Sequence, residues 1–274
     1  MNDFKVDYHI HTTASDGKAR PTEIVKQAKD LDYDIIAITD HDNVDGMQEA
    51  MIAAEALEIR VVPGVEIAVE TDEGIGLHML GYYIDIHSEQ LRSFLRDLIE
   101  RRKNYNNQLF RTLQNMGYDI SESDVRPGKN NFIGKPQIAG ALLRKGYITD
   151  ERQAYGPEFL RSPQCQKIPS PKPAAADAIR VIKEAGGTAV LAHPIQTRGI
   201  GRPGSEEFFA NIDKIIKQLK IQGLGGLECY HPDQNAEESG RFVELAEKYH
   251  LHITRGSDFH GSDLAEADET AEYR

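Results

Sequence analysis

The sequence predicts an α/β fold, a barrel of about seven strands with a helical insertion near its middle. Short apolar segments of the strand type alternate with amphipathic helical segments in both halves of the chain, which is typical of βα units. Side chains of the metal-binding type follow these strands repeatedly, as expected at the carboxyl end of a βα barrel. A doubly wound open sheet is the alternative, but no glycine-rich phosphate fingerprint follows the first predicted strand.

The first part of the chain provides four of the predicted strands. They cover residues 6–10, 35–38, 60–67 and 77–84, and the second is an unbroken apolar run of the buried parallel type. Pro21 opens a predicted helix that runs to residue 31, because proline is favoured at the first helical position. An alanine-rich helix is expected over residues 44–57. These segments therefore form the first βα units of the barrel.

Residues 87–170 interrupt the alternation. One long amphipathic helix is predicted over residues 88–116, and shorter helices are expected near 136–145 and 151–155. Residues 161–173 are rich in Pro, Ser and Gln and are expected to form a loop. We therefore predict a barrel made of residues 1–86 and 171–274, and a helical insertion of residues 87–170 that covers the active site.

The alternation resumes with three more strands, expected at residues 188–192, 226–229 and 253–254. Helices are predicted over residues 174–185, 206–219 and 236–249, and the acidic tail after Gly261 is expected to be loose. The count of strands, about seven with intervening helices, is what favours a barrel.

Composition narrows the classes of function. The formal net charge of −12 argues against a protein that tracks long nucleic acid, because such proteins usually present a basic face. No apolar run is long enough for a bilayer span, and the first residues lack a signal-peptide apolar segment. The two cysteines form no CxxC pair, which fits a reducing cytoplasm rather than a disulfide scaffold or a thiolate zinc site.

Histidines gather at the predicted strand ends. His9 and His11 can grip one ion together, because residues two apart on a strand point to the same side. Seven of the ten histidines are predicted to lie at or near the carboxyl ends of strands, namely His9, His11, His41, His78, His193, His231 and His260. Imidazoles mixed with carboxylates suit manganese, iron or zinc. The three other histidines, His87, His250 and His252, are expected to be structural or surface groups.

Several carboxylates accompany these histidines. Glu66 ends a buried strand, where an unpaired charge would be costly, so it is the best candidate for a carboxylate that bridges two ions. Asp16 lies in a loop within reach of the first histidine pair, with a turn or cap role as the alternative. Asp40 precedes His41 and is a candidate to orient an imidazole from outside the ligand set.

The motif set resembles the PHP family, the polymerase and histidinol phosphatase domains. The matching segments, in order, are DYHIHTTASDG at 7–17, ITDHD at 38–42, PGVEI at 63–67, LHMLG at 77–81, LAHP at 191–194 and GSDFHG at 256–261. Asp16 in the ASDG loop and the helical insertion make the chain most similar to the stand-alone branch of RNase AM and the 3′,5′-nucleoside bisphosphate phosphatases. A departure lies in the insertion, where Lys135 and Gln137 stand in GKPQ and relatives typically show Gly-Arg-Pro-His.

The resemblance implies a distorted seven-stranded (β/α) barrel of PHP type with a trinuclear metal site, hence two to three divalent ions per chain, manganese first and iron or zinc as alternatives. The ligands it implies for the first ion are His9, His11, Glu66 and Asp258. Those for the second are Glu66, His78 and His193, with Glu66 bridging. Those for the third are Asp16, His41 and His260.

The predicted reaction is hydrolysis of a nucleotide phosphomonoester by a metal-bridging hydroxide. The resemblance favours a 3′,5′-nucleoside bisphosphate, or short RNA degraded from its 5′ end, as the small phosphorylated substrate. His231 is the candidate catalytic residue, either contacting phosphate or protonating the leaving oxygen. Lys135, Arg161 and Lys167 of the insertion are candidates to bind a second phosphate. Histidinol phosphate is the alternative substrate, and a metal-dependent interaction or regulatory module without turnover is the alternative class; no membrane association is expected.

Overall fold

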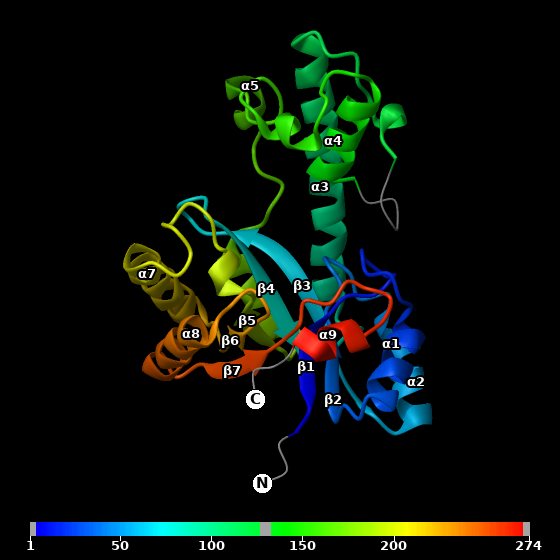
Figure 1. Cartoon of the computed structure of the whole chain (residues 1–274), viewed down its shortest axis with the longest axis vertical. Coiled ribbons are helices and arrows are strands. Elements are labelled where there is room, and N and C mark those ends of the chain that lie inside the picture. Colours follow the sequence, from blue (N-terminus) through cyan, green and yellow to red (C-terminus); the bar gives the residue numbers. More distant parts are fainter. Residues whose placement is uncertain (1–3, 127–132, 271–274) are drawn as a thin grey trace. The chain divides into compact units, whose positions relative to one another are not determined.

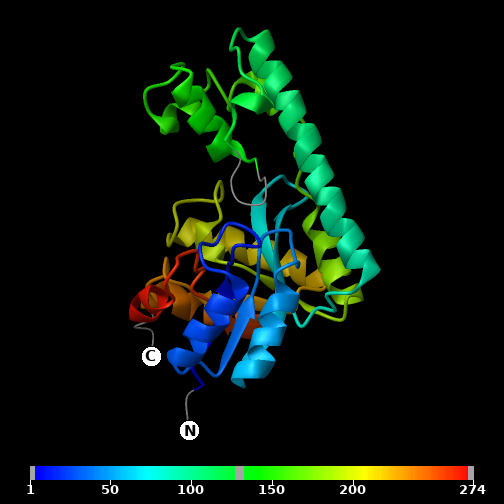
Figure 2. The same ribbon diagram turned by 90° about the vertical axis from the view of Figure 1, so that its right-hand side faces the viewer.

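The computed structural model describes residues 4–126 and 133–270 of the chain. The chain divides into two compact units, which we call the barrel unit (Met1–Leu95 with Pro173–Arg274) and the helical unit (Arg96–Lys172). Figures 1 and 2 show the ribbon of both units in two views. Each unit has its own buried apolar core, so each is described by itself.

The barrel unit is built on one sheet of seven strands in sequential order. The strands are β1 (Val6–Ile10), β2 (Ile35–Ile38), β3 (Arg60–Glu70), β4 (Gly76–Tyr82), β5 (Thr188–Leu191), β6 (Gly226–Tyr230) and β7 (His252–Arg255). All neighbours pair in parallel except β4, which is antiparallel to both β3 and β5. The predicted α/β barrel of seven strands is thus confirmed.

The sheet is joined into a barrel by the segment after β7 rather than by β7 itself. The backbone N–H of His11 donates to the carbonyl of Phe259 at 2.9 Å, and that of Phe259 donates to the carbonyl of His9 at 3.2 Å. The buried Asp7 carboxylate reinforces this seam, since it accepts from the Ser257 amide at 3.0 Å and from the Ser257 hydroxyl at 2.5 Å. The seam therefore brings the two ends of the chain's motif set into contact.

Five helices cover the outside of the barrel unit (Figure 1). They are α1 (Pro21–Asp30), α2 (Met47–Leu57), α6 (Ala175–Glu184), α7 (Glu206–Gln222) and α8 (Ala236–Lys248). Their buried side chains recur at helical spacing, as in α7 with Phe208, Ile212, Ile216 and Leu219. Helix α6 lies close to β4, because a Cβ at Gly81 would be 3.0 Å from Ile182 Cγ1.

The reversed direction of β4 corrects one detail of the sequence prediction. His78 is the third residue of β4 and therefore lies near the amino end of that strand, not near its carboxyl end. Because β4 runs against β3 and β5, its amino end lies beside the carboxyl end of β5, and the Ala192 amide donates to the carbonyl of His78 at 3.1 Å. His78 is thus on the same face as the other strand-end histidines.

The prediction of a loose tail after Gly261 is wrong for the part of the tail that the structure describes. Residues Ala265–Thr270 form helix α9, and Leu264 before it is fully buried. Gln27 of α1 fixes the segment, since its side chain donates to the Ser262 carbonyl at 3.0 Å and accepts from the Leu264 amide at 2.6 Å. The buried Leu264 and the two hydrogen bonds of Gln27 therefore order this segment, although its acidic composition is typical of a loop.

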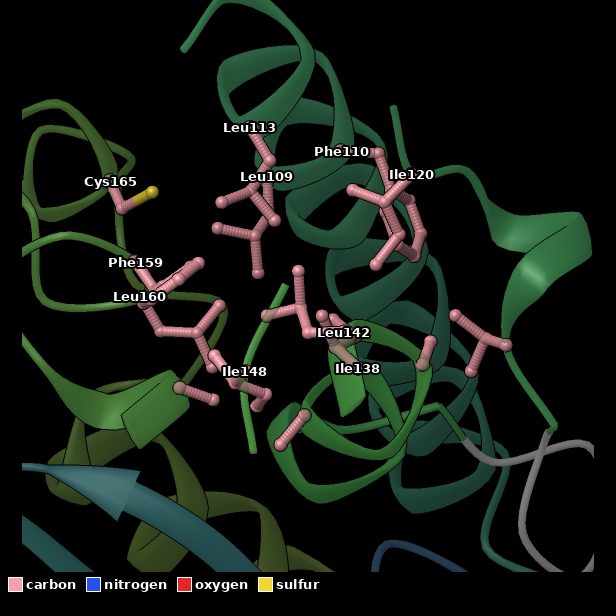
Figure 3. Close-up of a cluster of buried hydrophobic side chains, with 14 residues drawn as sticks. Leu109, Phe110, Leu113, Ile120, Ile138, Leu142, Ile148, Phe159, Leu160 and Cys165 are labelled. Carbon is pink, nitrogen blue, oxygen red and sulfur yellow. The ribbon is translucent and has the colours of Figure 1, made fainter. Parts of the chain in front are cut away.

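The helical unit contains most of α3 (Glu89–Asn115), with η1 (Glu122–Asp124), α4 (Lys135–Arg144), η3 (Glu151–Tyr155) and α5 (Pro163–Gln166). Figure 3 shows Leu109 and Leu113 of α3 directed toward Leu142 and Leu160 in one buried apolar cluster. Helix α5 falls within the segment expected to be a loop. Ser162 caps it by accepting from the Cys165 amide at 3.2 Å, and proline occupies its first position.

Two features bear on the chain's environment. Both cysteines, Cys165 and Cys229, are buried free thiols. Among the helices of the described residues, none is long and apolar enough to cross a membrane.

Candidate metal centre

The site is centred on Glu66 of β3, whose carboxylate is fully buried. Its two oxygens face different histidines. Oε1 lies 2.8 Å from His78 Nδ1 and 3.0 Å from His193 Nε2. Oε2 lies 3.0, 3.2 and 3.4 Å from His41 Nδ1, His11 Nε2 and His9 Nε2, respectively. Glu66 therefore stands between two sets of imidazoles, with one oxygen directed to each.

The strand geometry of β1 explains the first pair. His9 and His11 flank Ile10, both imidazoles are fully buried, and their ring centroids are 5.2 Å apart. The loop after β7 adds Asp258, whose Oδ1 lies 3.2 Å from His11 Nε2 and 3.4 Å from His9 Nε2. Asp258 has a φ of 53°, in the left-handed region that non-glycine residues rarely adopt. The loop therefore holds the backbone of Asp258 in a strained conformation that places its carboxylate beside the two histidines.

His260 turns toward a different carboxylate. Its Nδ1 lies 2.7 Å from the carbonyl oxygen of Asp258, so Nδ1 carries the proton and Nε2 of the neutral ring has the lone pair. That Nε2 lies 3.2 Å from Asp16 Oδ1, and Asp16 Oδ2 lies 3.8 Å from His41 Nε2. Asp16, His41 and His260 thus converge beside the first pair.

Three groups among the described residues have the composition and spacing of cation sites. The inner group is His9, His11, Glu66 and Asp258; the outer group is His11, Asp16, His41 and His260; the third group is His41, Glu66 and His78. His193 adjoins the third group through Glu66 Oε1. His11 belongs to two groups, but a neutral imidazole has one lone pair and can ligate an ion in only one of them.

The chemistry of the donor set fits divalent cations. Several of its polar atoms are buried without a hydrogen-bond partner among the residues that the structure describes, namely His9 Nε2, both ring nitrogens of His11 and Glu66 Oε2. Such orphaned atoms are rare in folded proteins unless they meet a ligand or an ion. Imidazole nitrogens and carboxylate oxygens without thiolates are the ligands of zinc, manganese and iron. The residues present therefore fit a multinuclear divalent-metal centre.

The charges of these three groups influence one another's pKa values. Burial opposes ionisation of Glu66, but the attraction of His41 and His9 holds the pKa of Glu66 well below its usual range. Burial likewise tends to lower the pKa of His41, yet Glu66 and Asp16 raise that pKa to about 9. Protons on the imidazoles therefore balance the buried carboxylates, and cation binding would displace these protons.

His231 was the sequence candidate for catalysis, and it lies at the edge of the cluster. Its Nδ1 accepts a hydrogen bond from the Asp233 amide at 3.1 Å, so Nε2 of the neutral ring carries the proton. That Nε2 is buried, has no hydrogen-bond partner within residues 4–126 and 133–270, and lies 3.8 Å from Asp258 Oδ2. The ring thus directs an N–H toward the inner group.

The candidate phosphate-binding cations lie in the helical unit. Lys135 is the first residue of α4, Lys167 follows α5, and Arg161 lies between η3 and α5; all three are exposed. Gln137, the departure from the family motif, has a structural role, because its side chain accepts from the Gly134 amide at 3.0 Å and caps α4.

Two buried carboxylates have roles that the sequence reasoning did not assign. Asp40 was considered as a partner for an imidazole, but it instead anchors the Asp16 loop, accepting from the Thr12 amide at 2.8 Å and the Ser15 hydroxyl at 2.6 Å. Glu228, in the middle of β6, lies 3.1 Å from His9 Nδ1. Glu228 shares the sequence feature that singled out Glu66, because it too is a carboxylate within an apolar strand.

The outer group is expected to release its cation first. The Asp16 side chain is 52% exposed, whereas that of Glu66 in the inner group is fully buried. We expect Asp16→Asn to lower manganese content by about one ion per chain, because Asp16 is a charged candidate ligand that belongs to the outer group only. Mass spectrometry of metal content after dialysis tests this, with the exposed Asp45→Asn as the matched control. Loss of all ions in Asp16→Asn would contradict the separation into groups.

The chain is similar in sequence to known proteins over most of its length. The family model for the PHP domain matches residues 7–147. A phosphoribosyl 1,2-cyclic phosphate 1,2-diphosphodiesterase from Eggerthella lenta is 31% identical, over 93% of this chain and 94% of the relative. A 3′,5′-nucleoside bisphosphate phosphatase from Chromobacterium violaceum is 28% identical, over 93% and 87%. A 5′–3′ exoribonuclease from Haemophilus influenzae is 27% identical, over 93% and 90%.

Solved structures agree with this assignment. A candidate metal-dependent phosphoesterase from Bifidobacterium adolescentis is 30% identical with a TM-score of 0.71, covering 95% of this chain and 89% of that one. A Chromobacterium violaceum protein described as an amidohydrolase with bound sulfate is 25% identical with a TM-score of 0.74, covering 97% and 96%. Fold, site composition and sequence similarity lead to one conclusion: the chain belongs to the PHP domain family.

Proposed function

We propose that the chain is a divalent-metal-dependent phosphoesterase that hydrolyses phosphomonoesters of nucleotides, either 3′,5′-nucleoside bisphosphates or short RNA from its 5′ end. The observation that carries the proposal is the buried Glu66 carboxylate, with one oxygen toward His78 and His193 and the other toward the first histidine pair. A carboxylate placed in this way is suited to bridge two ions, as two-metal phosphoesterase chemistry requires.

In this proposal the ligands are the nine residues His9, His11, Asp16, His41, Glu66, His78, His193, Asp258 and His260. Bound divalent ions would supply positive charge to the phosphate and an activated nucleophile at neutral pH. Manganese is the proposed ion, with iron or zinc as alternatives, and a donor set of imidazoles and carboxylates without thiolates suits all three. The free thiols of Cys165 and Cys229 support a reducing, cytoplasmic setting.

His231 is proposed to contact the phosphate or its leaving oxygen as a hydrogen-bond donor. Because the Asp233 amide occupies Nδ1, the ring is neutral, and loss of the Nε2 proton would leave an imidazolate; the ring is therefore suited to donate a hydrogen bond rather than a proton. Hydrolysis breaks the P–O ester bond, and water would supply the proton that the leaving sugar oxygen requires. His231 holds a proton at Nε2 because the Asp233 amide occupies Nδ1, and no other hydrogen bond competes for it among the described residues.

We expect His231→Ala to lower kcat on a nucleoside monophosphate about 100-fold, because the variant removes a donor that would face the negative charge developing on the leaving oxygen. The same variant should lose far less on p-nitrophenyl phosphate, whose leaving oxygen needs little stabilisation. Steady-state kinetics on the two substrates measures the difference, with His231→Gln, which keeps a donor, as the control. Equal losses on both substrates would show that His231 binds the phosphoryl group or packs the site, and would remove its role at the leaving oxygen.

Lys135, Arg161 and Lys167 are proposed to bind a second phosphate. All three are exposed cations, and Lys135 lies 6.0 Å from the ring centroid of Tyr105 in a cation–π contact. Alanine at these positions should then raise KM for a nucleoside bisphosphate more than for a monophosphate, since a monophosphate lacks the second charged group.

Turnover of defined substrates tests the proposal. Purified protein with manganese should release phosphate from a 3′,5′-nucleoside bisphosphate or nucleotides from a 5′-phosphorylated short RNA, and alanine at His9 and His11 should abolish this. Phosphoribosyl 1,2-cyclic phosphate is the second candidate substrate, favoured by the 31% identity to the enzyme from Eggerthella lenta. Histidinol phosphate completes the panel. Absence of hydrolysis on all four would leave a metal-dependent interaction module as the function.

A further inference from the structure

Glu228 is a fully buried carboxylate in an otherwise apolar strand. It occupies the middle of β6, between Leu227 and Cys229, and it is not among the proposed ligands. A buried carboxylate is costly unless its lone pairs are satisfied. The contacts of its two oxygens therefore indicate why the strand carries it.

Both oxygens of Glu228 contact donors from other strands. Oε1 lies 3.1 Å from His9 Nδ1, and Oε2 accepts from the backbone amide of His193 at 2.6 Å. His9 belongs to β1 and His193 follows β5, so Glu228 connects the elements that place two of the proposed ligands. The connection is made to the Nδ1 side of the His9 ring, opposite the Nε2 that faces Glu66.

This contact determines which ring nitrogen of His9 has a lone pair. An ionised carboxylate is only an acceptor, so Nδ1 of the neutral ring carries the proton and Nε2 is left unprotonated. His9 Nε2 lies 3.4 Å from Glu66 Oε2 and 3.4 Å from Asp258 Oδ1. When the His9 ring is neutral, three lone-pair atoms therefore face one another, an arrangement that a bound cation would stabilise.

The backbone around Glu228 restricts the positions of its two partners, His9 and His193. A Cβ at Gly256 would lie 2.2 Å from His9 Cβ and 2.6 Å from Glu228 Oε1, so only glycine allows the loop after β7 to pass here. His193 has a φ of 23°, which is unfavourable for a non-glycine residue, and its hydrogen bond to Glu228 Oε2 holds that backbone in place.

We propose that Glu228 is a positioning residue that fixes the Nδ1-protonated form of His9 and the backbone of His193, and thereby sets the affinity of the inner group for its cation. The inference rests on the proposed metal-dependent function. It concerns a residue outside the proposed ligand set, which would act through its contacts with two proposed ligands, His9 and His193.

The test is the isosteric variant Glu228→Gln. A glutamine has one acceptor oxygen, whereas both partners are donors, so either the His193 amide loses its partner or the glutamine amide donates to His9 Nδ1. In the second case the proton of neutral His9 moves to Nε2, where it blocks coordination. We expect the affinity for Mn²⁺, measured by titration calorimetry, to fall about 10–100-fold, the range found for partners of metal-binding histidines.

Two controls separate positioning from packing. Asp213→Asn alters a partly buried carboxylate of α7 outside the centre, which accepts from Lys248 Nζ and from the Tyr249 hydroxyl, both at 2.8 Å. Asp213→Asn should lower thermal stability while Mn²⁺ affinity stays within about threefold of the wild type. Glu228→Asp keeps an acceptor-only carboxylate, so it should preserve the Nδ1-protonated ring and recover part of the affinity.

Nitrogen-15 NMR of the zinc-loaded wild-type protein gives a direct readout that does not depend on any variant folding. We expect the proton of His9 on Nδ1. A proton on Nε2, or a Glu228→Gln protein with unchanged Mn²⁺ affinity, overturns the inference even if the wild type hydrolyses nucleotides. A wild type that binds Mn²⁺ but hydrolyses nothing overturns the proposed function and leaves the role of Glu228 intact.

Discussion

Replacement of Glu66 by glutamine is expected to abolish phosphate release and to remove most of the bound metal. The Glu66 carboxylate is fully buried and lies within 3.4 Å of nitrogens from five histidines, so the amide would remove the one negative charge common to both sets. Changes next to metal ligands already cost about 10–100-fold, and loss of a bridging carboxylate should exceed this. Phosphate release and metal content of Glu66→Gln measure the effect.

Glu73→Gln is the matched control, because Glu73 is an exposed carboxylate in the turn between the same two strands, β3 and β4. It should retain wild-type metal content and turnover. Activity of Glu66→Gln within about tenfold of the wild type, with full metal content, would show that Glu66 is not the bridging ligand.

Addition of manganese is expected to raise the unfolding temperature of the barrel unit by about 5–10 °C. A ligand at 100 times its Kd stabilises the folded state by about 2.7 kcal/mol, and each kcal/mol shifts Tm by about 2–4 °C in domains of this size. All residues of the three cation groups lie in the barrel unit. The transition of the helical unit, which has its own core, should therefore move little.

Differential scanning calorimetry with and without manganese tests this expectation, and a chelator should reverse the shift. The Glu66→Gln variant serves as the control, since it should lose most of the stabilisation. A shift of equal size in that variant would place the effect of manganese outside the proposed centre.

The fold could be predicted well because its signals are local. Apolar runs such as residues 35–38 and the proline at the start of α1 determine their own elements. The direction of β4 could not be predicted in this way, because an apolar strand reads the same whether its neighbour is parallel or antiparallel. Helix α9 was missed for a related reason: its stability depends on contacts with Gln27, which is more than 200 residues away in sequence.

In the candidate site, too, local features could be predicted from the sequence and long-range contacts could not. Histidines at strand ends stand out in a sequence, and contacts in the structure connect all nine proposed ligands with one another. The roles of Glu228 and Asp40 depend on which donors face them across the barrel, and no spacing in the sequence encodes that. Glu228 nevertheless carried a readable signal, since a carboxylate inside a buried strand requires a partner.

The seam between Asp7 and Ser257 has a consequence for the order of folding. It joins residues 250 positions apart, and contacts of such long range pay the largest loop-closure entropy and form late. The inner group needs both His9 of β1 and Asp258, which follows β7. A chain emerging from the ribosome therefore cannot assemble this group until Asp258 has been released, so any cation can reach the complete inner group only after all seven strands of the sheet have been synthesised.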